Sequence, residues 1–583
     1  MKRKFVQIAA SCLSAALLLS FGGERAAAAP LPSPAGGRVI RVGLHYGTGA
    51  MEGLNLENET GSGFRFGYYD GSSQFVPMGS TAQKAISIVP TVNVYYGTYN
   101  GYASYHAALT SSAIAVGVYH LQLPGTYASF EEAQAAAAQY PGGFPAYING
   151  VFYARVGNYT TSDQARAAQA ALGAACELAW TSKYGVNAVA TGTNTILFQY
   201  DDSGSGTGLG VEPVSAAGEK CVTLSKGYFY NGGFRFERIN GGMLTVVNMV
   251  ELEDYVKGVI PYEMSDSWPL EALKAQAVAA RSYAVALGTA HGSGHFDLCN
   301  SIHCQVYQGR NKAGANSDAA VDQTAGQFAL YNGKAAQTFF YASNGGASES
   351  VSNVWGSNQA NYPYLVGKAD PYELTLNLND YWNRTFTSAQ IISRVLKDYS
   401  VSGSITSASV SSYTGAGNPK TITFTDSAGK NYTVSSAKVY SSLGLPSFRF
   451  GFAGSGTAQP APAPTAPSGD VTVNGSTPVG GTSGLYAIDG NGNLTPLRGD
   501  VYVVTDGGAV SQLGQDQVQP SNPGSTPWSG SAAAVNGSLT FSGRGWGHNI
   551  GMSQRGAYAM AEQGYTYQQI LQFYYTGITV GYM

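Results

Sequence analysis

Charge is scarce in this sequence, since Asp, Glu, Lys and Arg make up 11% of its 583 residues, less than half the share of a typical globular protein. The formal net charge of −3 argues against a general polyanion binder such as a nucleic-acid-binding protein. Beyond the N-terminal region, no segment has the ~20 apolar residues that are needed to span a bilayer. The 44% of apolar residues nevertheless suffices for ordinary buried cores, and the length allows roughly two to four domains.

Polarity comes instead from uncharged residues, which include 76 Gly and 40 Tyr. Flat tyrosine rings cover the C–H faces of sugars while their hydroxyl groups remain hydrated. The composition therefore suits a protein that binds polysaccharide, although many secreted β-rich proteins share it.

The N-terminus has the pattern of an export signal. Met1 to Lys4 is a basic segment, Ile8 to Phe21 is largely apolar, and Ala27 to Ala29 offer a cleavage site before Pro30. We therefore predict that residues 1–29 are a signal peptide and that the mature protein is secreted and works outside the cytoplasmic membrane. The alternative is an uncleaved membrane anchor.

Cysteine is also rare, with five residues, of which Cys12 would leave with the signal peptide. Cys12 has no convincing lipobox before it, which argues against a lipoprotein. The four others, Cys176, Cys221, Cys299 and Cys304, allow three pairings in an exported protein, but their even number alone establishes none.

Two of these cysteines lie in a segment with metal-ligand chemistry. His295, Cys299, His303 and Cys304 gather two His and two Cys within ten residues, a set that suits tetrahedral zinc, and His291 is a spare candidate. The alternative is a Cys299–Cys304 disulfide that closes the loop. We expect any zinc here to be structural, because a closed set of four ligands leaves no position for water.

The pattern of the chain divides into successive regions. Strand-like segments with Gly and Asn turns fill residues 38–115. Residues 116–201 then contain two strand–helix units that indicate a small duplicated α+β module: strands at 118–123, 146–156 and 195–200, and helices from Ser129 to near Tyr140 and from Ser162 to Leu172. Ser129 is predicted as the N-cap of the first helix.

Residues 210–452 begin with further strands, followed by a long helical segment and mixed structure. Residues 453–468 (AGSGTAQPAPAPTAPS) are a Pro/Ala linker that cannot pack a core. Residues 469–537 are predicted to be a β-rich insert with a hairpin at LYAIDGNGNLTPL, and residues 538–583 resume the earlier, motif-rich pattern. The two ends of one domain therefore flank an insert.

A helix is predicted to start at Pro269, directly after a loop that contains Glu263. Its small apolar residues recur at three- and four-residue steps and form one narrow buried stripe: Leu270, Leu273, Ala277, Ala280, Ala284 and Leu287. Lys274, Val278 and Arg281 fall on a different face. Glu263 precedes this helix in a Pro-Tyr-Glu-Met loop, where apolar neighbours would raise the pKa of a carboxyl group. A general acid needs such a pKa to protonate a glycosidic oxygen near neutral pH, although a cap or a solvated side chain is the simpler interpretation.

Several long motifs, in order, resemble the SpoIID/LytB family (stage II sporulation protein D, amidase enhancer). They are YVKGVIPYEM…WPLEALKAQAVAARSYA, QVYQG at 305–309, FYASNGGASESVSNVW at 340–355, YPYL at 362–365 and GRGWGHNIGMSQRGAYAMAEQGYTYQQILQFYYTG at 543–577. In addition, HLQLPGTYASFEEAQAAA and YARVGNYTTSDQARAAQAAL resemble the two halves of a SPOR domain, a family that binds glycan strands without stem peptides. The alternative for residues 116–201 is an α+β insertion without a ligand.

The resemblance implies that Glu263 matches the catalytic acid of peptidoglycan lytic transglycosylases. These enzymes cleave between N-acetylmuramic acid and N-acetylglucosamine without water, and the muramyl C6 hydroxyl closes onto C1 to leave a 1,6-anhydro end. One acid suffices for this reaction, whereas a hydrolase normally needs two carboxylates at a controlled separation. The candidates for a second carboxylate are Asp266, Glu271, Glu349 and Asp370, although a cap, turn or solvated role is simpler for each.

The resemblance also implies a glycan-binding cleft. On the helix and the loop after it, the implied residues are Lys274, Gln276, Arg281, Tyr283, Gln305 and Tyr307, although Arg281 equally suits a structural ion pair. In two polar loops they are Ser343, Asn344, Gly345, Gly346, Trp546, His548, Ser553 and Gln554. A neutral hydrogen-bonding role for His548 is favoured over an acid–base role. Ser553 lies outside a G-x-S-x-G elbow, so we exclude a serine hydrolase.

We therefore expect an α+β fold with a sheet-rich SpoIID-type body, a catalytic helix beside a cleft, and a small SPOR-like module. The expected function is a secreted lytic transglycosylase that acts on denuded glycan strands in sporulation or cell-wall remodelling, with a cell-wall amidase as a further partner. No cofactor is needed for this chemistry, although some family members carry zinc where the His/Cys set lies. The alternatives are a non-catalytic enhancer of an N-acetylmuramoyl-L-alanine amidase and a wall-binding structural protein.

Overall fold

The computed structural model describes residues 37–453 apart from short gaps (110–111, 113, 173–174, 216–221, 226, 289–290, 292–294, 377 and 379), the backbone of six short strands between 471 and 512, and residues 530–583. The described chain divides into two compact units. The N-terminal unit contains residues 37–337 and 580–583, and the C-terminal unit contains residues 338–579. This division falls inside residues 210–452, which the sequence pattern presents as one region. The predicted signal peptide and nearly all of the predicted linker lie outside the described residues.

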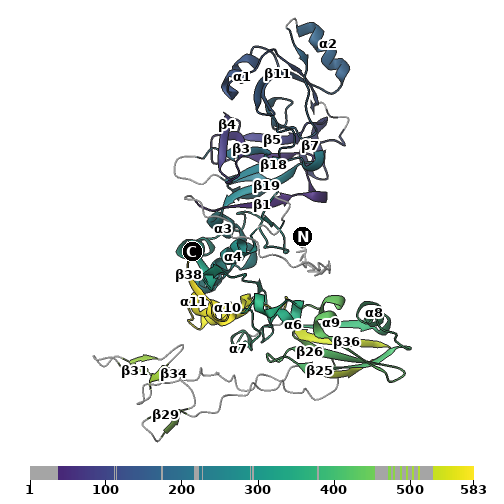
Figure 1. Cartoon of the computed structure of the whole chain (residues 1–583), viewed down its shortest axis with the longest axis vertical. Coiled ribbons are helices and arrows are strands. Elements are labelled where there is room, and N and C mark those ends of the chain that lie inside the picture. Colours follow the sequence, from purple (N-terminus) through teal and green to yellow (C-terminus); the bar gives the residue numbers. More distant parts are fainter. Residues whose placement is uncertain are drawn as a thin grey trace, which may run out of the picture. The chain divides into compact units, whose positions relative to one another are not determined.

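A seven-stranded sheet supports the helices of the N-terminal unit (Figure 1). Ile40, Val42 and Leu44 of its N-terminal strand are buried with the period of two that places one face of a strand on a core. That strand pairs antiparallel with the strand that leads into the helix of Glu263. The strand order is β20 (Leu298–Cys299), β1 (Val39–His45), β19 (Thr245–Glu251), β18 (Gly233–Glu237), β15 (Leu209–Pro213), β3 (Phe64–Tyr69) and β4 (Phe75–Thr81).

A ten-stranded sheet contains six strands of the predicted 116–201 module and four strands from outside it. Its order is β12 (Glu177–Leu178), β9 (Tyr119–Gln122), β11 (Val151–Tyr159), β10 (Gly143–Ile148), β14 (Ile196–Asp201), β13 (Val186–Ala190), β5 (Ala85–Pro90), β2 (Leu54–Glu57), β16 (Val222–Ser225) and β17 (Tyr228–Asn231). The module is therefore continuous with its neighbours, because β13 pairs with β5. The predicted strand at 146–156 is instead the β10–β11 hairpin.

Two helices cover one face of the module's strands (Figure 1). Helices α1 (Phe130–Ala137) and α2 (Ser162–Leu172) both contribute buried alanines to the core that Leu121 and Val156 share. The predicted N-cap is confirmed, since the Ser129 side chain accepts a hydrogen bond from the Glu132 N–H (3.2 Å).

The rest of the N-terminal unit consists of three helices and two small sheets. The elements are α3 (Leu252–Glu263), α4 (Leu270–Leu287) and α5 (Ala315–Gln323), the sheet of β7 (Tyr102–His106), β6 (Val94–Tyr99) and β8 (Ala115–Val116), and the sheet of β22 (Lys334–Ala335), β21 (Gln327–Tyr331) and β38 (Thr579–Tyr582). Short 3₁₀ turns occur at Gly47–Gly49 and Ile239–Gly241.

Helix α4 is buried on nearly all sides, and the predicted narrow stripe is wrong in its extent. Val278 and Arg281, which were expected on a different face, are fully buried. The alanines of the helix explain this, because their small side chains let α3, α5 and β21 all pack against it. Pro269 lies at the N-cap position, so the helix begins at Leu270, one residue later than predicted.

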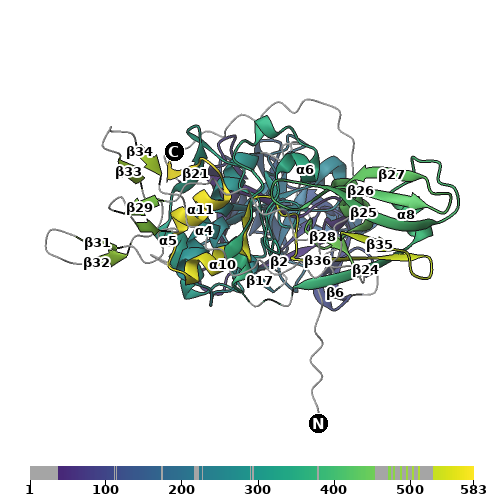
Figure 2. The same ribbon diagram turned by 90° about the horizontal axis from the view of Figure 1, so that it is seen from below.

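The C-terminal unit is built on three sheets, two of which lie at the right of Figure 2. The sheets are β24 (Tyr381–Thr387), β36 (Ser538–Arg544) and β28 (Phe450–Phe452); β27 (Asn431–Ser435), β26 (Pro419–Asp426), β25 (Ile405–Tyr413) and β35 (Ser531–Ala533); and the parallel pair β23 (Phe340–Tyr341) and β37 (Met552–Ser553). The helices are α6 (Val351–Trp355), α7 (Pro371–Leu374), α8 (Ser388–Arg394), α9 (Ser436–Leu443), α10 (Gln554–Glu562) and α11 (Tyr567–Tyr574), with a 3₁₀ turn at Gln359–Asn361.

The predicted β-rich insert contains three two-stranded hairpins among its described residues. They pair β29 (Val471–Val473) with β30 (Thr477–Val479), β31 (Tyr486–Ile488) with β32 (Leu494–Pro496), and β33 (Tyr502–Val504) with β34 (Val510–Gln512). The second is the hairpin predicted at LYAIDGNGNLTPL.

The mixture of helices with mainly antiparallel sheets confirms the α+β class. No helix among the described residues is long and apolar enough to cross a membrane.

Candidate functional site

Glu263 is the last residue of helix α3. The sequence had suggested a loop before α4, and this prediction is wrong. Pro261 signals a break, but it lies in the last turn, and the buried side chains of Val256, Val259 and Ile260 hold that turn in place. The chain becomes extended at Met264. Glu263 is half-buried, so a substrate group can reach a side chain whose backbone is fixed.

The loop after β20 contacts Glu263 directly, because the Val306 N–H donates a hydrogen bond to Glu263 Oε1 (3.3 Å). Two neighbours anchor this loop. The Gln305 side-chain amide donates to the Tyr255 hydroxyl and to the Ala280 carbonyl (both 3.2 Å), and the buried Tyr307 hydroxyl donates to Asn248 Oδ1 (2.6 Å). The carboxyl group is therefore oriented by a loop that α3, α4 and β19 all hold.

A glycine in α3 makes this arrangement possible. A Cβ atom at Gly258 would lie 2.4 Å from Cε2 of Tyr307, so any larger residue would displace the ring. The Tyr307 ring also packs on that of Tyr255, with a centroid separation of 5.0 Å. Close approach, and not a turn, therefore accounts for this glycine.

Gln276 stands out among the side chains of α4. It is fully buried, and neither polar atom of its amide has a hydrogen-bond partner among the described residues. It lies one helical turn before Ala280, whose carbonyl holds Gln305. A buried amide without partners is costly, and because Gln276 has no exposed surface, its amide lies inside the protein, away from any surface that a substrate could reach.

The structure places the other predicted residues of this helix in supporting positions. Arg281 is fully buried, and its guanidinium pairs with Glu253 (2.7 Å) and donates to the Gln327 carbonyl (3.0 Å). Lys274 pairs with Glu271 (2.8 Å), and Tyr283 is buried. Of the two alternatives for Arg281, the geometry favours the structural ion pair.

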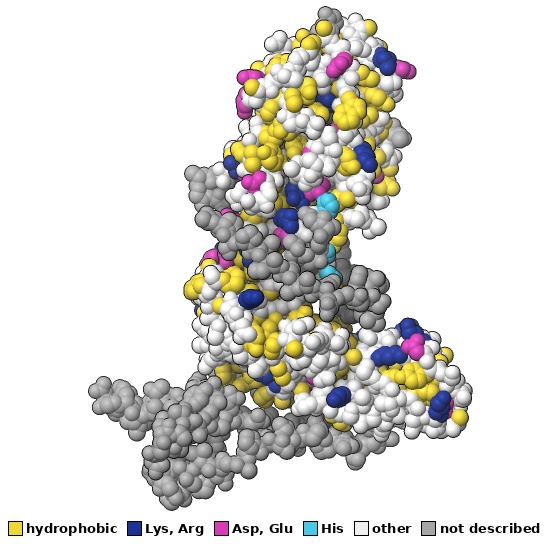
Figure 3. All heavy atoms as spheres, in the orientation of Figure 1, with side chains coloured by type: hydrophobic (Ala, Val, Ile, Leu, Met, Phe, Trp, Pro, Cys, Tyr) yellow, Lys and Arg dark blue, Asp and Glu magenta, His cyan; other side chains and the backbone are white. Residues whose placement is uncertain are grey.

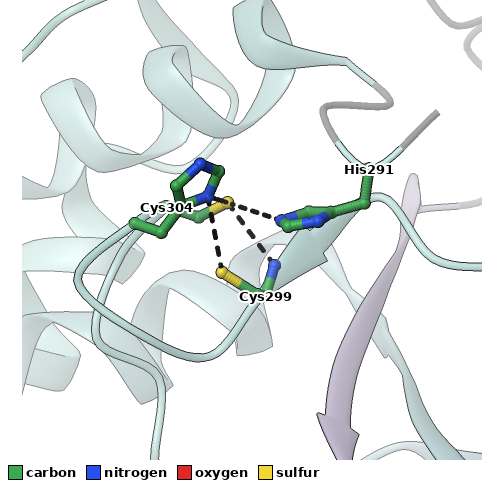
Figure 4. A group of neighbouring side chains, drawn as sticks. His291, Cys299 and Cys304 are labelled. Atoms are coloured by element: carbon green, nitrogen blue, oxygen red, sulfur yellow. Dashed lines mark hydrogen bonds between the residues drawn. The ribbon is translucent and has the colours of Figure 1, made fainter. Parts of the chain in front are cut away.

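A group of four metal-type ligands precedes the loop that contacts Glu263. Ligand atoms of His291, Cys299, His303 and Cys304 all lie within 4.8 Å of one another. Figure 4 shows the side chains of three of these residues, His291, Cys299 and Cys304, pointing toward one another. Cys304 Sγ lies 3.4 Å from His291 Nε2 and 3.6 Å from His303 Nδ1. Tetrahedral zinc separates a thiolate from an imidazole nitrogen by roughly 3.6 Å, so the spacing fits this ion.

His295 does not belong to this group, contrary to the predicted set, and the spare candidate His291 takes its place. The ring of His295 is instead paired with Glu237, whose Oε2 lies 2.7 Å from Nδ1. Spacing along the chain did not distinguish the two histidines, because only the fold shows that Glu237 of β18 faces His295.

The thiols have the electrostatics of a ligand pair and do not form a disulfide. A hydrogen bond from Cys304 lowers the pKa of Cys299 to about 3, and the same contact together with burial raises the pKa of Cys304. Cys299 is thus the more acidic of the two thiols. Cys176 is also a free cysteine, and Cys221 lies outside the described residues.

The two predicted polar loops lie side by side in the C-terminal unit. Ser343 and Trp546 exchange backbone hydrogen bonds (3.0 and 2.8 Å), and the Asn549 amide donates to the Asn344 carbonyl (3.0 Å). Gly345 has a φ of 65°, and a Cβ atom there would lie 2.5 Å from the Arg544 carbonyl oxygen. Close strand contact therefore explains the glycines of this segment.

A buried carboxylate, Glu373, holds these loops together, and the sequence interpretation missed it. Its oxygens accept hydrogen bonds from the N–H groups of Asn344 (2.9 Å) and Gly345 (2.8 Å) and from the hydroxyls of Ser343 (2.6 Å) and Ser553 (2.5 Å). Burial and the charge of Asp370 raise the pKa of Glu373 to about 7. The Asp370–Pro371 pair at the start of α7, typical of a helix N-terminus, was the available signal.

Most of the residues in these loops that were predicted to bind substrate are therefore buried or hydrogen-bonded within the protein. Ser343, Asn344 and Ser553 are buried and bound to Glu373, and Gly346 and Gln554 lie beside them, also buried. Trp546 is 41% exposed and can contact a ligand. In His548, Nδ1 accepts a hydrogen bond from the Ile550 N–H (3.1 Å), and burial lowers the pKa of the ring to about 4, so it is neutral near pH 7.

The candidates for a second catalytic carboxylate are engaged elsewhere. Asp266 accepts the Ser317 N–H (2.7 Å), and Glu271 is paired with Lys274. Glu349 is buried and accepts the Thr414 hydroxyl (2.7 Å) and the Asn418 amide (3.0 Å). Asp370 caps α7 and accepts the Tyr574 hydroxyl (2.6 Å).

Comparison with known proteins agrees with this part of the fold. Residues 240–331, which contain α3, α4 and the loop at Glu263, match the family model described as stage II sporulation protein (SpoIID). An amidase enhancer of Bacillus subtilis is 33% identical over 328 residues, 56% of this chain and 40% of that protein. An uncharacterized protein of Brachyspira hyodysenteriae is 46% identical over 143 residues, 24% of this chain and 38% of that protein. Stage II sporulation protein D of Bacillus subtilis is 28% identical over 142 residues, 22% of this chain and 40% of that protein.

The chain thus spans about two fifths of the length of these relatives. Residues 240–331 are therefore similar to the SpoIID family, and a longer part of the chain is similar to an amidase enhancer.

Proposed function

We propose that this protein is a cell-wall lytic transglycosylase that cleaves peptidoglycan glycan strands with Glu263 as the catalytic group. The observation that carries the proposal is the position of Glu263: a half-buried carboxyl at the end of a rigid helix, oriented by the Val306 N–H.

One carboxyl group suffices for this reaction. Glu263 donates its proton to the glycosidic oxygen as the bond from C1 of N-acetylmuramic acid breaks, which releases N-acetylglucosamine with a free hydroxyl. The C6 hydroxyl of the muramyl residue then bonds to C1, and its proton passes to the Glu263 carboxylate. The proton count balances, and no second carboxylate is needed to activate water.

The His/Cys group would hold zinc as a structural ion in this proposal. The donors His291, Cys299, His303 and Cys304 fit it, and zinc would cross-link the loop that leads to Gln305 and Val306. Because four protein ligands close the coordination sphere, we assign it no catalytic step.

We place the protein outside the cytoplasmic membrane, on the basis of the N-terminal pattern and the proposed substrate. We further propose that the strands and helices of residues 116–201 hold denuded glycan. A second candidate function, stimulation of a wall amidase, is favoured by the 33% identity with a protein named amidase enhancer.

The release of soluble fragments from purified glycan strands tests the proposal. Wild type should release fragments, and Glu263→Gln should reduce the rate by at least ~10²-fold, the usual loss for a missing acid catalyst. Glu251→Gln is the matched control, since Glu251 is an exposed carboxyl at the opposite end of the same helix. If neither wild type nor the control releases fragments but both stimulate an amidase, the enhancer function is correct and the enzyme is excluded.

A further inference from the structure

Trp355 is a half-exposed indole with a rigid support. It is the last residue of α6, which ends there because Gly356 adopts the left-handed conformation (φ 68°, ψ 11°). Its ring centroid lies 4.8 Å from that of Phe339 and 5.1 Å from that of His548, yet 44% of the residue is exposed. Two rings therefore support the indole while much of its surface remains open to solvent.

His548 acts as a fixed support in this arrangement. Its ring also packs on Tyr341 with a centroid separation of 5.2 Å, and the Ile550 N–H fixes its Nδ1. The Glu349 N–H donates to the Asn549 carbonyl (2.6 Å), which ties the segment before α6 to the segment that contains His548. The position of Trp355 is thus set by two parts of the chain that are about two hundred residues apart in sequence.

The segment that carries Trp355 is polar but uncharged. Residues 350–367 contain no Asp, Glu, Lys or Arg, and the side chains of Ser352, Asn358 and Asn361 in this segment are exposed. Charged side chains are sparse over the visible face of the molecule as a whole (Figure 3). An uncharged polar segment around an exposed aromatic residue suits a neutral ligand that is rich in hydroxyl groups.

We propose that Trp355 is a stacking platform for an N-acetylhexosamine unit of a glycan strand, and that Phe339 and His548 position it. The C–H face of a pyranose covers the open part of the indole, and the neutral Ser and Asn side chains can bind hydroxyl and acetamido groups. This site deepens the proposed function, on which it rests for the identity of the polysaccharide, but it is a binding site in the C-terminal unit and takes no part in bond cleavage.

Calorimetric titration of the full chain tests the proposal, with peptide-free oligosaccharides of alternating N-acetylglucosamine and N-acetylmuramic acid as the probe. The parent protein carries Glu263→Gln, so that the probe is not cleaved. Trp355→Ala should weaken binding about tenfold, as expected for the loss of a central aromatic contact, whereas Trp355→Phe should recover part of the affinity. Tyr399→Ala is the matched control, because Tyr399 is also a 41% exposed aromatic residue of the C-terminal unit.

The outcomes separate this site from the catalytic proposal. Weaker binding by Trp355→Ala, with an unchanged melting temperature, supports the platform even if wild type cleaves nothing. Equal affinities of the parent and Trp355→Ala overturn it, even if Glu263 proves catalytic. Unchanged glycan binding together with a loss of amidase stimulation also overturns it and assigns Trp355 to a protein contact.

Discussion

Glu263 and Glu373 show how two carboxyl groups in one chain differ in their surroundings. Glu373 is fully buried, and its four hydrogen bonds fix the loop at Ser343 and the start of α10. Glu263 is half-buried at the end of a helix, where a ligand can reach it. Burial alone therefore identifies a structural carboxylate as readily as a catalytic one, and accessibility separates the two.

The raised pKa of Glu373 predicts a pH-dependent contribution to stability. The ordinary pKa is 4.5 and the folded value is about 7, so between these values the unfolded chain loses the proton while the folded chain keeps it. The free energy of unfolding contributed by Glu373 therefore falls as pH rises from about 4.5 to about 7. His548, with a pKa lowered to about 4, contributes in the opposite direction below its ordinary value of 6.5.

The Glu373→Gln variant isolates the contribution of Glu373 to the pH dependence of stability from that of His548. We expect the variant to be less stable than wild type at pH 5, because it loses hydrogen-bond acceptors, and the difference to narrow at pH 7.5. Urea unfolding of both proteins at the two pH values measures this. A difference that stays constant or widens with pH would show that Glu373 is already ionised in the folded protein at pH 5.

Arg281 provides a second test at the scale of the residue. Its replacement by Ala leaves Glu253 without its ion-pair partner, and we expect the free energy of unfolding to fall by about 3 kcal/mol. Lys at this position should restore part of the stability. A variant that is as stable as wild type but binds glycan poorly would instead assign Arg281 to the substrate, the alternative that the sequence left open.

At the scale of the element, the loop from His291 to Tyr307 connects the His/Cys group to Glu263. Cys304 directly precedes Gln305 and Val306, the residues that contact α4 and Glu263. A metal ion bound to Cys304 would thus restrict the residues that orient the carboxyl group.

The two histidines of this loop give a prediction about metal content. We expect purified wild type and His295→Ala to contain about one zinc per chain, and His291→Ala to have lost most of it, because only His291 faces the two thiols. Elemental analysis by mass spectrometry measures the content, and the melting temperature with and without a chelator gives an independent measure. Equal zinc in both variants, or zinc lost only in His295→Ala, would contradict the assignment.

Local patterns predicted the elements well where they are self-contained. The helix at Ser162–Leu172, its neighbour capped by Ser129 and the hairpin at Tyr486–Pro496 follow from periodicity, capping and turn residues. Helix α3 was missed because Pro261 signals a helix end, and only tertiary burial of its apolar side overrides that signal. The choice of His291 over His295 depends on Glu237, which lies more than fifty residues earlier in the chain.

At the scale of the whole molecule, the order of elements along the chain does not match their grouping in space. Strand β38 at the C-terminus joins the sheet of β21 and β22 in the N-terminal unit, whereas the residues before it belong to the C-terminal unit. Similarly, β1 pairs with β19, about two hundred residues later. Periodicity cannot predict such pairings, because they depend on which sheet edges are free after the intervening segments have folded.

Removal of residues 580–583 tests this chain path. The deletion takes away most of β38 and the hydrogen bond between Gln327 and the Tyr582 hydroxyl (3.4 Å). In scanning calorimetry, we expect the transition of the N-terminal unit to shift down by about 2–4 °C, the change for a loss of ~1 kcal/mol in a unit of this size. The transition of the C-terminal unit should not move, and a shift of that transition alone would contradict the assignment of β38.

The masses of the new ends on glycan strands provide the most direct test of the central claim. Purified strands are incubated with wild type or Glu263→Gln, and the products are identified by mass spectrometry. The account predicts 1,6-anhydro-muramyl ends, lighter than reducing ends by one water, with wild type only. Reducing ends would show hydrolysis and a second carboxylate, and anhydro ends made equally by Glu263→Gln would remove Glu263 from the reaction.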